Sequence, residues 1–453
     1  MATINDYAPD FELLREMLEE KQLINLKKEI SDMNEVDIAV FMEELDSDKA
    51  LIVFRLLNKD LASEVFACLS SDTQEHIITS ISDTDLHFMI EDLFVDDVVD
   101  LLEELPATVV KRILRIATPQ TRNLINQFLR YPDDSAGSIM TAEYVALKKT
   151  MTVSDAINYI RKTGVDKETI YTCYVTGPQR FLEGIVSLKD LIMSSPDCII
   201  EEIMDTNVIK CVTTEEQEEI IQTFNKYDLL ALPVVDHENR IVGIITVDDV
   251  FDVMEEETTE DMEKMAAITP SEKPYLKTGV FETFKQRIPW LLILMISAAF
   301  TGQILTAYES ALASCIILTS FIPMLMNTGG NSGSQSSVTV IRGLSIGEIE
   351  FKDIFKVLGK EFLVSILCGI VLALANLLKL ILIDRIAIEI AVVVCLTLLI
   401  TVIAAKIVGC LLPMVAKKIG FDPAVMANPF ITTIVDALSL VIFFNIATYI
   451  LGI

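Results

Sequence analysis

The sequence predicts a multidomain membrane protein: an all-α superhelical N-terminal domain, a repeated α/β module, an acidic linker helix and an α-helical membrane domain with five transmembrane helices. Three observations predict this order: an uneven charge distribution, two kinds of internal repeat in the first 270 residues, and long apolar runs after them. The mean hydropathy of the 453 residues is +0.46, although the formal net charge is −30. A chain can combine both values only if its halves differ in composition.

The acidic residues are concentrated in the first part of the chain. Residues 1–270 contain 55 acidic and 23 basic residues, whereas residues 271–453 contain 11 acidic and 13 basic residues. So negative a surface excludes nucleic acid as a partner and attracts cations. The alternative interpretation is an acidic surface that only keeps this half soluble.

Cysteine and histidine usage gives no sign of enzymatic or zinc chemistry. The eight cysteines form no CxxC pair, the three histidines are scattered, and no nucleophile–base set stands out, so we expect no enzyme. The first residues, MATINDYAPDFELL, lack the pattern of a cleaved signal peptide. We therefore expect the first half to stay in the cytosol.

The N-terminal domain is predicted over residues 1–132. A short unit with apolar residues at helical spacing recurs as DIAVFMEEL (37–45), DLASEVFACL (60–69), DLHFMIEDL (85–93) and DVVDLLEEL (97–105). The first three copies begin 23 and 25 residues apart. Such a period is typical of stacked helix pairs that form a superhelix.

A second repeat is predicted over 137–255, with copies at 137–200 and 202–255. Each copy provides a short strand, a helix, two further strands and a closing helix. In the second copy, a turn at His237-Glu238-Asn239 joins the two further strands. The matching stretches are SIMTAEYVAL (138–147) with EIMDTNVIKC (202–211), and FLEGIVSLKDLIM (181–193) with RIVGIITVDDVFDVM (240–254).

An acidic linker is predicted over 247–275, with a helix at 247–268. Asp249, Asp252, Glu257 and Glu260 fall within about 140° of one helical face, at roughly 100° per residue. Carboxylates this close repel one another unless cations screen them. The segment is thus either a cation-sensitive coupling element or a solubilising spacer.

The membrane domain is predicted over 280–453. Five apolar spans of about 20 residues or more, each long enough to cross a bilayer core of ~30 Å, are expected near 288–308, 311–328, 355–383, 386–416 and 428–452. Basic residues gather before the first span, between the second and third, and between the fourth and fifth. The N-terminus is therefore expected in the cytosol and the C-terminus outside.

Two features of the membrane domain depart from an apolar pattern. The stretch PMLMNTGGNSGSQSSVTV (323–340) is rich in glycine and small polar residues, so we expect irregular backbone that lines a cavity or is buried in protein, or else a cytosolic loop. Lys406 lies near the inner end of a span, and we expect its side chain to extend to the interface.

Asp436 is the only charged residue in the last apolar stretch. A charge at membrane depth is costly unless it faces a cavity, a partner or an ion. Asn428, Thr432 and Asp436 recur every four residues and form one polar stripe on a helix. Their oxygen atoms suit hard cations such as Mg²⁺, which favours a cation path over a purely structural buried aspartate.

Three stretches resemble the MgtE family of bacterial magnesium channels: VDDVFDVMEEETTED (247–261), MLMNTGGNSGSQSS (324–337) and GFDPAVMANPFITTIVDALSL (420–440). The α/β repeat resembles a cystathionine-β-synthase (CBS) pair. The resemblance implies Mg²⁺ uptake across the bacterial inner membrane by a homodimer embedded in lipid. It implies Asp436 as the central carboxylate for hydrated Mg²⁺ and Asn428 near the cytosolic mouth.

The resemblance also implies a cytosolic sensor, in which Mg²⁺ bound between the N-terminal domain, the CBS pair and the linker closes the pore. The residues that match this sensor are Glu64, Asp96, Asp100, Glu218, Asp228, Asp249, Asp252, Glu257 and Glu260. Since CBS pairs often bind adenosine nucleotides, ATP is a further candidate ligand, for which the stretch SLKD (187–190) is weak evidence.

The alternative function is a secondary transporter of divalent cations such as Co²⁺ or Mn²⁺, coupled to another ion. A helix broken near Gly329 and Gly330 would fit such a transporter, with Asp436 as the coupling group. An ATP-driven pump is not favoured, because the chain has no GxxxxGK[ST] segment.

Overall fold

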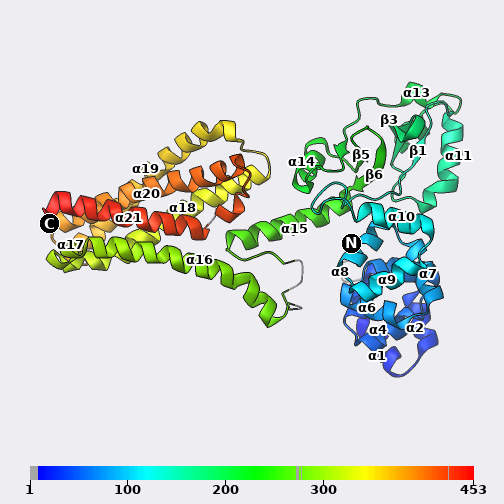
Figure 1. The fold of residues 1–453 in the computed structure, drawn as a ribbon, viewed down its shortest axis with the longest axis horizontal. Helices are drawn as coiled ribbons and strands as arrows, with labels where there is room; N and C mark the ends of the chain where they lie inside the picture. Colours follow the sequence, from blue (N-terminus) through cyan, green and yellow to red (C-terminus); the bar gives the residue numbers. More distant parts are fainter. Residues whose placement is uncertain (1–8, 272–274, 277, 427, 453) are drawn as a thin grey trace, which may run out of the picture. The chain divides into compact units, whose positions relative to one another are not determined.

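The computed structural model describes residues 9–271, 275–276, 278–426 and 428–452. The chain divides into two compact units, Met1–Phe251 and Asp252–Ile453 (Figure 1). Each unit is described separately below.

The described N-terminal part of the first unit is all-helical, as the sequence predicts. Alternate helices pack together, α3 on α5, α5 on α7, α7 on α9, and α4 on α6, which is the layered arrangement of a superhelix. The helices are α1 (Phe11–Glu19), α2 (Leu23–Ile30), α3 (Glu35–Glu43), α4 (Ser47–Phe54), α5 (Lys59–Ala67), α6 (Ser71–Ser80), α7 (Asp83–Asp92), α8 (Val95–Glu104), α9 (Ala107–Ile116) and α10 (Pro119–Phe128).

Capping side chains start several of these short helices. Asn58 accepts from the backbone N–H of Leu61 at 2.9 Å, and Ser82 accepts from that of Asp85 at 3.2 Å. Each cap satisfies an N–H that the first turn of a helix leaves unpaired. The repeated caps let the chain reverse every eight to ten residues and stack its helices.

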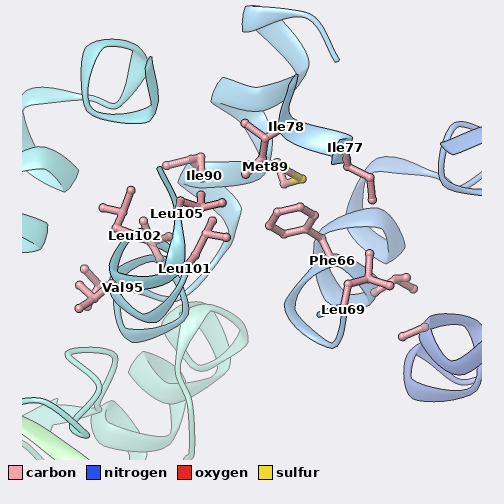
Figure 2. Packing of buried hydrophobic residues seen from close by; sticks show 14 of the residues in the cluster. Phe66, Leu69, Ile77, Ile78, Met89, Ile90, Val95, Leu101, Leu102 and Leu105 are labelled. Atoms are coloured by element: carbon pink, nitrogen blue, oxygen red, sulfur yellow. The ribbon is translucent and has the colours of Figure 1, made fainter. Parts of the chain in front are cut away.

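A continuous apolar core joins the layers. Figure 2 shows Phe66 of α5 among Ile77 of α6 and Met89 of α7, with Leu101 of α8 in the neighbouring layer. Phe66 and Ile77 are at most 1% exposed. Burial of such side chains contributes roughly 1.5–3 kcal/mol each, which more than offsets the weak intrinsic stability of short helices.

The rest of the first unit contains two three-stranded sheets, one for each copy of the predicted repeat. In both sheets a short first strand runs parallel to the second, and the second and third form an antiparallel hairpin. The strands are β1 (Ala146–Leu147), β2 (Thr172–Thr176), β3 (Leu182–Ser187), β4 (Cys211–Val212), β5 (Ala231–Val235) and β6 (Ile241–Thr246). The helices are α11 (Val153–Thr163), α12 (Leu188–Met193), α13 (Ile200–Ile203) and α14 (Gln217–Tyr227).

The two copies exchange their leading segments. Thr141, which precedes β1, pairs with Ile244 of β6 through two hydrogen bonds of 2.8 Å. Asp205, which precedes β4, pairs in the same way with Ile185 of β3 at 2.8 and 2.9 Å. Each copy therefore completes the sheet of the other, and neither is a self-contained domain.

The linker forms the predicted helix, α15 (Val247–Met265), and long helices follow it. They are α16 (Val280–Ala307), α17 (Glu309–Ser314), α18 (Ile322–Ser345), α19 (Ile354–Leu382), α20 (Ile388–Lys418) and α21 (Asn428–Leu451). Helix α20 packs against α18, α19 and α21, and α21 packs against α16 and α18, so these helices form a bundle. Figure 1 shows them running side by side within the second unit.

Four described helices are long and apolar enough to cross a membrane, namely α16, the segment Phe351–Leu382 that contains α19, α20, and the segment Ala424–Leu451 that contains α21. Helix α18 is a fifth long helix but is more polar, with Ser332, Ser336 and Ser337 buried. The count of five transmembrane helices remains a prediction.

The prediction of irregular backbone or a loop over 323–340 is wrong, because α18 is a continuous helix from Ile322 to Ser345. The predicted span at 311–328 is also misplaced. Residues 309–321 form α17 and a short 3-10 segment, and the long helix begins only at Ile322. Glycine costs helix stability by about 1 kcal/mol in isolation, but tight packing of α18 in the bundle overrides that preference.

The prediction for Lys406 is also wrong. Its side chain is buried within the bundle rather than extended to an interface, with 5% of the residue exposed. Its ammonium group lies 3.0 Å from Ser336 Oγ and 3.5 Å from Glu361 Oε2. An internal partner on each of two neighbouring helices satisfies the charge inside the bundle.

Glycine allows α18 and α20 to approach closely. A Cβ atom at Gly409 would lie 2.3 Å from the carbonyl oxygen of Gly333 and 3.1 Å from its Cα. Neither backbone atom can move away independently of its helix. The contact therefore requires glycine at 409.

We expect Gly409→Ala to destabilise the bundle by roughly 1–3 kcal/mol, the usual cost of overpacking. Thermal unfolding of the purified protein in detergent measures the effect. Gly359→Ala in α19 is the control, because a Cβ there would meet no described atom within 4 Å apart from the neighbouring backbone of its own helix. Equal unfolding temperatures for the two variants would show that the close crossing is not needed.

Candidate functional site

A cavity of about 420 Å³ lies between α18 and α21. Asp436 of α21 is half-buried and lines it together with Thr432, one turn earlier. Asn327 and Asn331 face it from α18, one helical turn apart, and their side chains lie 3.4 Å from each other. Apolar Ile322, Pro323 and Met326 and the backbone of Gly330 complete the lining.

The paired glycines of α18 explain how its polar face comes to lie against α21. A Cβ at Gly329 would be 2.9 Å from Ser439 Oγ, and one at Gly330 would be 3.0 Å from Thr432 Cγ2. With no side chains there, α18 lies directly on α21. The asparagines of α18 and the carboxylate of Asp436 can then share one cavity.

The donor set suits a hydrated hard cation. Carboxylate and amide oxygens are the ligands that Mg²⁺ and Ca²⁺ prefer, and Mg²⁺ gives up its waters reluctantly. The volume leaves room for an ion that keeps part of its hydration shell. Asn428, the other pore residue expected from sequence, is the first residue of α21, and its side chain lies outside what the structure describes.

Asn327 and Asn331 are not among the site residues predicted from the sequence. Their spacing of four residues places them on one helical face, and this signal was available from the sequence. It was overlooked because the glycine-rich stretch was not expected to be helical.

The C-terminal end of α15 contacts the segment before α21. Lys264 Nζ lies 2.7 Å from Asp422 Oδ2 and 2.7 Å from Glu260 Oε1, one turn earlier on α15. Met265 packs beside Ile341 and Ala424. Within the second unit, the linker helix is therefore fastened to the bundle by an ion pair and an apolar contact.

Neither Lys264 nor Asp422 was among the residues selected from sequence. Lys264 is the only basic residue between 251 and 270, so a lone cation in an acidic helix was a usable signal. The partner Asp422 lies far along the chain, and only the fold brings it to the helix.

An acidic cluster lies in the first unit, where α8 approaches the CBS pair. Burial raises the pKa of Asp96 well above its usual range, and the charges of Asp97, Asp249 and Glu143 raise it further. One carboxyl oxygen of Asp96, Oδ1, is buried and has no hydrogen-bond partner among the residues that the structure describes. Burial, followed by Asp249 and Glu143, raises the pKa of Asp97 to about 6.

Glu168 belongs to the same acidic cluster. Burial raises its pKa to about 7, with smaller contributions from Asp249, Asp248, Asp97 and Glu143. Threonine hydroxyls orient two of these carboxylates: Thr246 Oγ1 donates to Asp249 at 2.5 Å, and Thr141 Oγ1 donates to Glu143 at 2.8 Å.

The structure brings Asp96 and Asp249 together from distant parts of the sequence. Glu143 and Glu168 join them, although sequence reasoning missed both because each is isolated in its own segment. Across the described ranges, no group of three or more His, Cys, Asp or Glu residues is arranged to hold a metal ion. The unpaired oxygen of Asp96 and the carboxylate donors fit a cation chemically, without a preformed cage.

The remaining residues selected from sequence lie on helix surfaces. Glu64 of α5 and Asp100 of α8 are exposed, Glu218 is in the first turn of α14, and Asp228 ends that helix in a left-handed conformation with φ of 50°. Asp252, Glu257 and Glu260 lie on α15 in the second unit, where Glu260 pairs with Lys264.

Family models match most of the chain. Residues 322–446 match the family described as "Divalent cation transporter", residues 33–134 match the MgtE intracellular N domain, and 136–197 and 200–256 match CBS domains. The fold and these matches define a membrane transporter for divalent cations that carries a helical intracellular domain and a CBS pair.

Curated relatives specify the family. The chain is 34% identical over 446 residues to "Magnesium transporter MgtE" of Thermus thermophilus, covering 97% of this chain and 98% of that protein. It is 35% identical to the protein of the same name from Bacillus subtilis, covering 78% of each. The chain belongs to the MgtE family.

Solved structures agree for the first half of the chain. A "Crystal structure of the soluble part of a magnesium transporter" aligns with 55% of this chain and 97% of its own, with 29% identity and a TM-score of 0.52. The cytosolic domain of the Mg²⁺ channel MgtE in complex with ATP aligns with 53% of this chain and 98% of its own, with 36% identity and a TM-score of 0.51.

The acidic cluster predicts a pH-dependent stability. Because the carboxyl pKa values of Asp97 and Glu168 are raised on folding, the folded state binds protons more tightly than the unfolded state. Stability is therefore greatest below the unfolded pKa values and is lost as the pH rises through about 6 to about 7. Without divalent cations, the unfolding temperature of a fragment covering 1–268 should fall by several degrees between about pH 5 and about pH 8.

Asp97→Asn should reduce that slope, whereas Asp32→Asn, which alters an exposed carboxylate in a loop, should leave it unchanged. Differential scanning calorimetry in the presence of a chelator measures both. An unfolding temperature that stays constant over this pH range would contradict the clustering of these carboxylates.

Proposed function

We propose that this protein carries Mg²⁺ across the bacterial inner membrane into the cytosol through the cavity between α18 and α21. The observation that carries the proposal is the position of Asp436, whose carboxylate shares this cavity with Asn327, Asn331 and Thr432. A relative that aligns with 97% of the chain and another that aligns with 78% of it bear the name magnesium transporter. The proposed mode is a channel driven by the membrane potential.

Charge at membrane depth supports a role for Asp436 in ion passage. A carboxylate within a membrane costs at least several kcal/mol unless it meets water, a partner or an ion. Asp436 meets a cavity that also holds the side chains of Asn327 and Asn331, and a passing divalent cation would offset its charge. A hydrated ion held by few oxygens can also leave readily, which conduction requires.

We propose that the transporter is a homodimer, as its resemblance to the family implies. Helix α16 supports this, because apolar side chains such as those of Leu291, Met295 and Phe300 are more than half exposed and are available to lipid or to a second copy. Two copies of Asp436 facing a common axis would repel each other, and the ion between them would relieve that repulsion.

Gating by cytosolic Mg²⁺ is proposed to act on the acidic cluster and on the acidic face of α15. Carboxylates such as Asp96 and Asp249 repel one another in a compact arrangement, and bound cations would favour that arrangement. The contact of Lys264 with Asp422 holds the end of α15 on the bundle. A compact cytosolic half would thereby stabilise the closed state, and its loosening would free α15.

The main argument for the alternative function, a secondary transporter coupled to another ion, does not hold. It was based on a broken helix near Gly329 and Gly330, whereas α18 is continuous across both. Transport that follows a proton or sodium gradient instead of the membrane potential would restore it.

ATP is proposed as a ligand of the CBS pair, on the basis of the ATP complex of a relative's cytosolic domain. The two copies have equivalent strand-to-helix corners. Ser187 donates to Asp190 at 2.5 Å in the first copy, and Thr246 donates to Asp249 at 2.5 Å in the second. Such corners present hydroxyl and carboxyl groups suited to the hydroxyls of a ribose.

Asp436→Asn should lower Mg²⁺ uptake by at least about tenfold, the equivalent of about 1.4 kcal/mol of lost ion stabilisation. The substitution keeps the side-chain shape and removes its charge. Uptake into proteoliposomes measured with a Mg²⁺-sensitive dye tests this. Asp384→Asn, in the turn between α19 and α20, is the control and should transport normally; normal uptake by Asp436→Asn would exclude the proposed path.

Neutralising the acidic face of α15 should weaken closure by cytosolic Mg²⁺. The variant Asp249→Asn, Asp252→Asn, Glu257→Gln, Glu260→Gln should raise the inhibitory Mg²⁺ concentration several-fold, because fewer carboxylates remain to be screened. Patch-clamp recording with Mg²⁺ stepped on the cytosolic side measures it.

The control for that variant instead neutralises four exposed carboxylates of the N-terminal domain, so the two variants have the same net charge. These residues are Glu12, Glu29, Asp32 and Asp48. If both variants close at the same Mg²⁺ concentration as the wild type, α15 is only a spacer.

A further inference from the structure

A buried polar network joins three helices of the bundle. Lys406 of α20 donates to Ser336 Oγ of α18 at 3.0 Å and lies 3.5 Å from Glu361 Oε2 of α19. Ser336 Oγ donates in turn to Glu361 Oε2 at 2.8 Å. The side chains of Lys406 and Glu361 are 6% and 15% exposed, and Ser336 is 2% exposed.

Such a network is not required for helix packing. Taking two charges out of water costs several kcal/mol each, and well-packed apolar residues of similar size often stabilise a core equally well or better. Ionisable groups within membrane helices are rare and usually serve the transported species or its pathway. The position of this network relative to the ion cavity indicates which part of the molecule it controls.

Helix α18 connects the network to the ion cavity, because it carries residues of both. Asn327 and Ser336 are nine residues apart, so at about 100° per residue they lie on opposite faces of the helix. The face with Asn327 and Asn331 lines the cavity. The opposite face holds Ser336, and Gly333 beside it packs against Gly409 of α20.

We propose that Lys406 is a positioning residue for ion transport. Through Ser336, and with its charge balanced by Glu361, it fixes the rotation of α18 about its axis. That rotation sets where Asn327 and Asn331 lie relative to Asp436. Close packing of glycines brings α18 and α20 together, and the directional hydrogen bond from Lys406 adds a preferred orientation of the Ser336 face. This inference rests on the proposed function.

The sharpest test removes only the hydroxyl that links Lys406 to α18. Ser336→Ala should raise the half-saturating Mg²⁺ concentration for uptake by about threefold or more, within the range of couplings carried through packed networks. Ser337→Ala is the matched control, because Ser337 is also fully buried but its Oγ has no hydrogen-bond partner. Its half-saturating concentration should equal that of the wild type.

The distinguishing readout is the half-saturating concentration rather than the maximal rate. A merely structural role would reduce the number of folded transporters and lower the maximal rate alone. The full-length protein in proteoliposomes, with external Mg²⁺ varied and uptake followed by dye fluorescence, separates the two. Equal half-saturating concentrations for Ser336→Ala and the wild type would overturn the proposal.

A second variant decides the matter if Ser336→Ala does not fold. Lys406→Met with Glu361→Leu replaces both charges by apolar side chains and leaves no buried charge unpaired. We expect this double variant to fold but to keep a raised half-saturating Mg²⁺ concentration; a wild-type value would overturn the proposal. Absence of Mg²⁺ uptake by the wild type, measured in parallel, would instead reject the proposed function and this inference with it.

Discussion

The free-energy cost of holding carboxylates close together, or away from water, determines which partners the acidic residues of this protein need. Asp96 and Asp97 are partly removed from water, and the nearby charges of Asp249 and Glu143 raise their pKa values further. In the second unit two carboxylates are balanced by lysines, Glu361 by Lys406 and Asp422 by Lys264. Asp436 faces a cavity lined by amides and a hydroxyl. Each carboxylate is therefore either paired internally or placed where a cation can reach it.

The difference between paired and unpaired carboxylates separates structural from responsive parts of the molecule. A lysine that is built into the fold is a fixed counter-charge, so its ion pair forms without a bound cation, and salt screens the buried Lys406–Glu361 pair less than the partly exposed Lys264–Asp422 pair. Carboxylates without a fixed counter-charge gain stability only from mobile cations or protons. The raised pKa of Asp97 shows such a dependence on protons in the first unit, and the proposed ion path would make Asp436 depend on cations in the second.

Close helix packing is the second constraint, and it acts together with the first. Gly329, Gly330, Gly333 and Gly409 let α18 lie against α20 and α21 with its backbone almost in contact. This closeness places polar groups of α18 on both sides of the helix near partners. Asn327 and Asn331 meet Asp436 across the cavity, while Ser336 meets Lys406 on the opposite side.

By itself, the sequence determined the features that depend on local patterns. Apolar spacing marked the helices of the N-terminal domain, the two matching repeats predicted the paired strands and the turn at 237–239, and the spacing of acidic residues predicted the acidic face of α15. Only the tertiary structure decided that the glycine-rich stretch is helical, because its packing partners come from α20 and α21. Likewise, Glu143 and Glu168 join Asp96 and Asp249, and Lys406 lies buried beside Glu361, because contacts between distant segments leave no periodic signal in the chain.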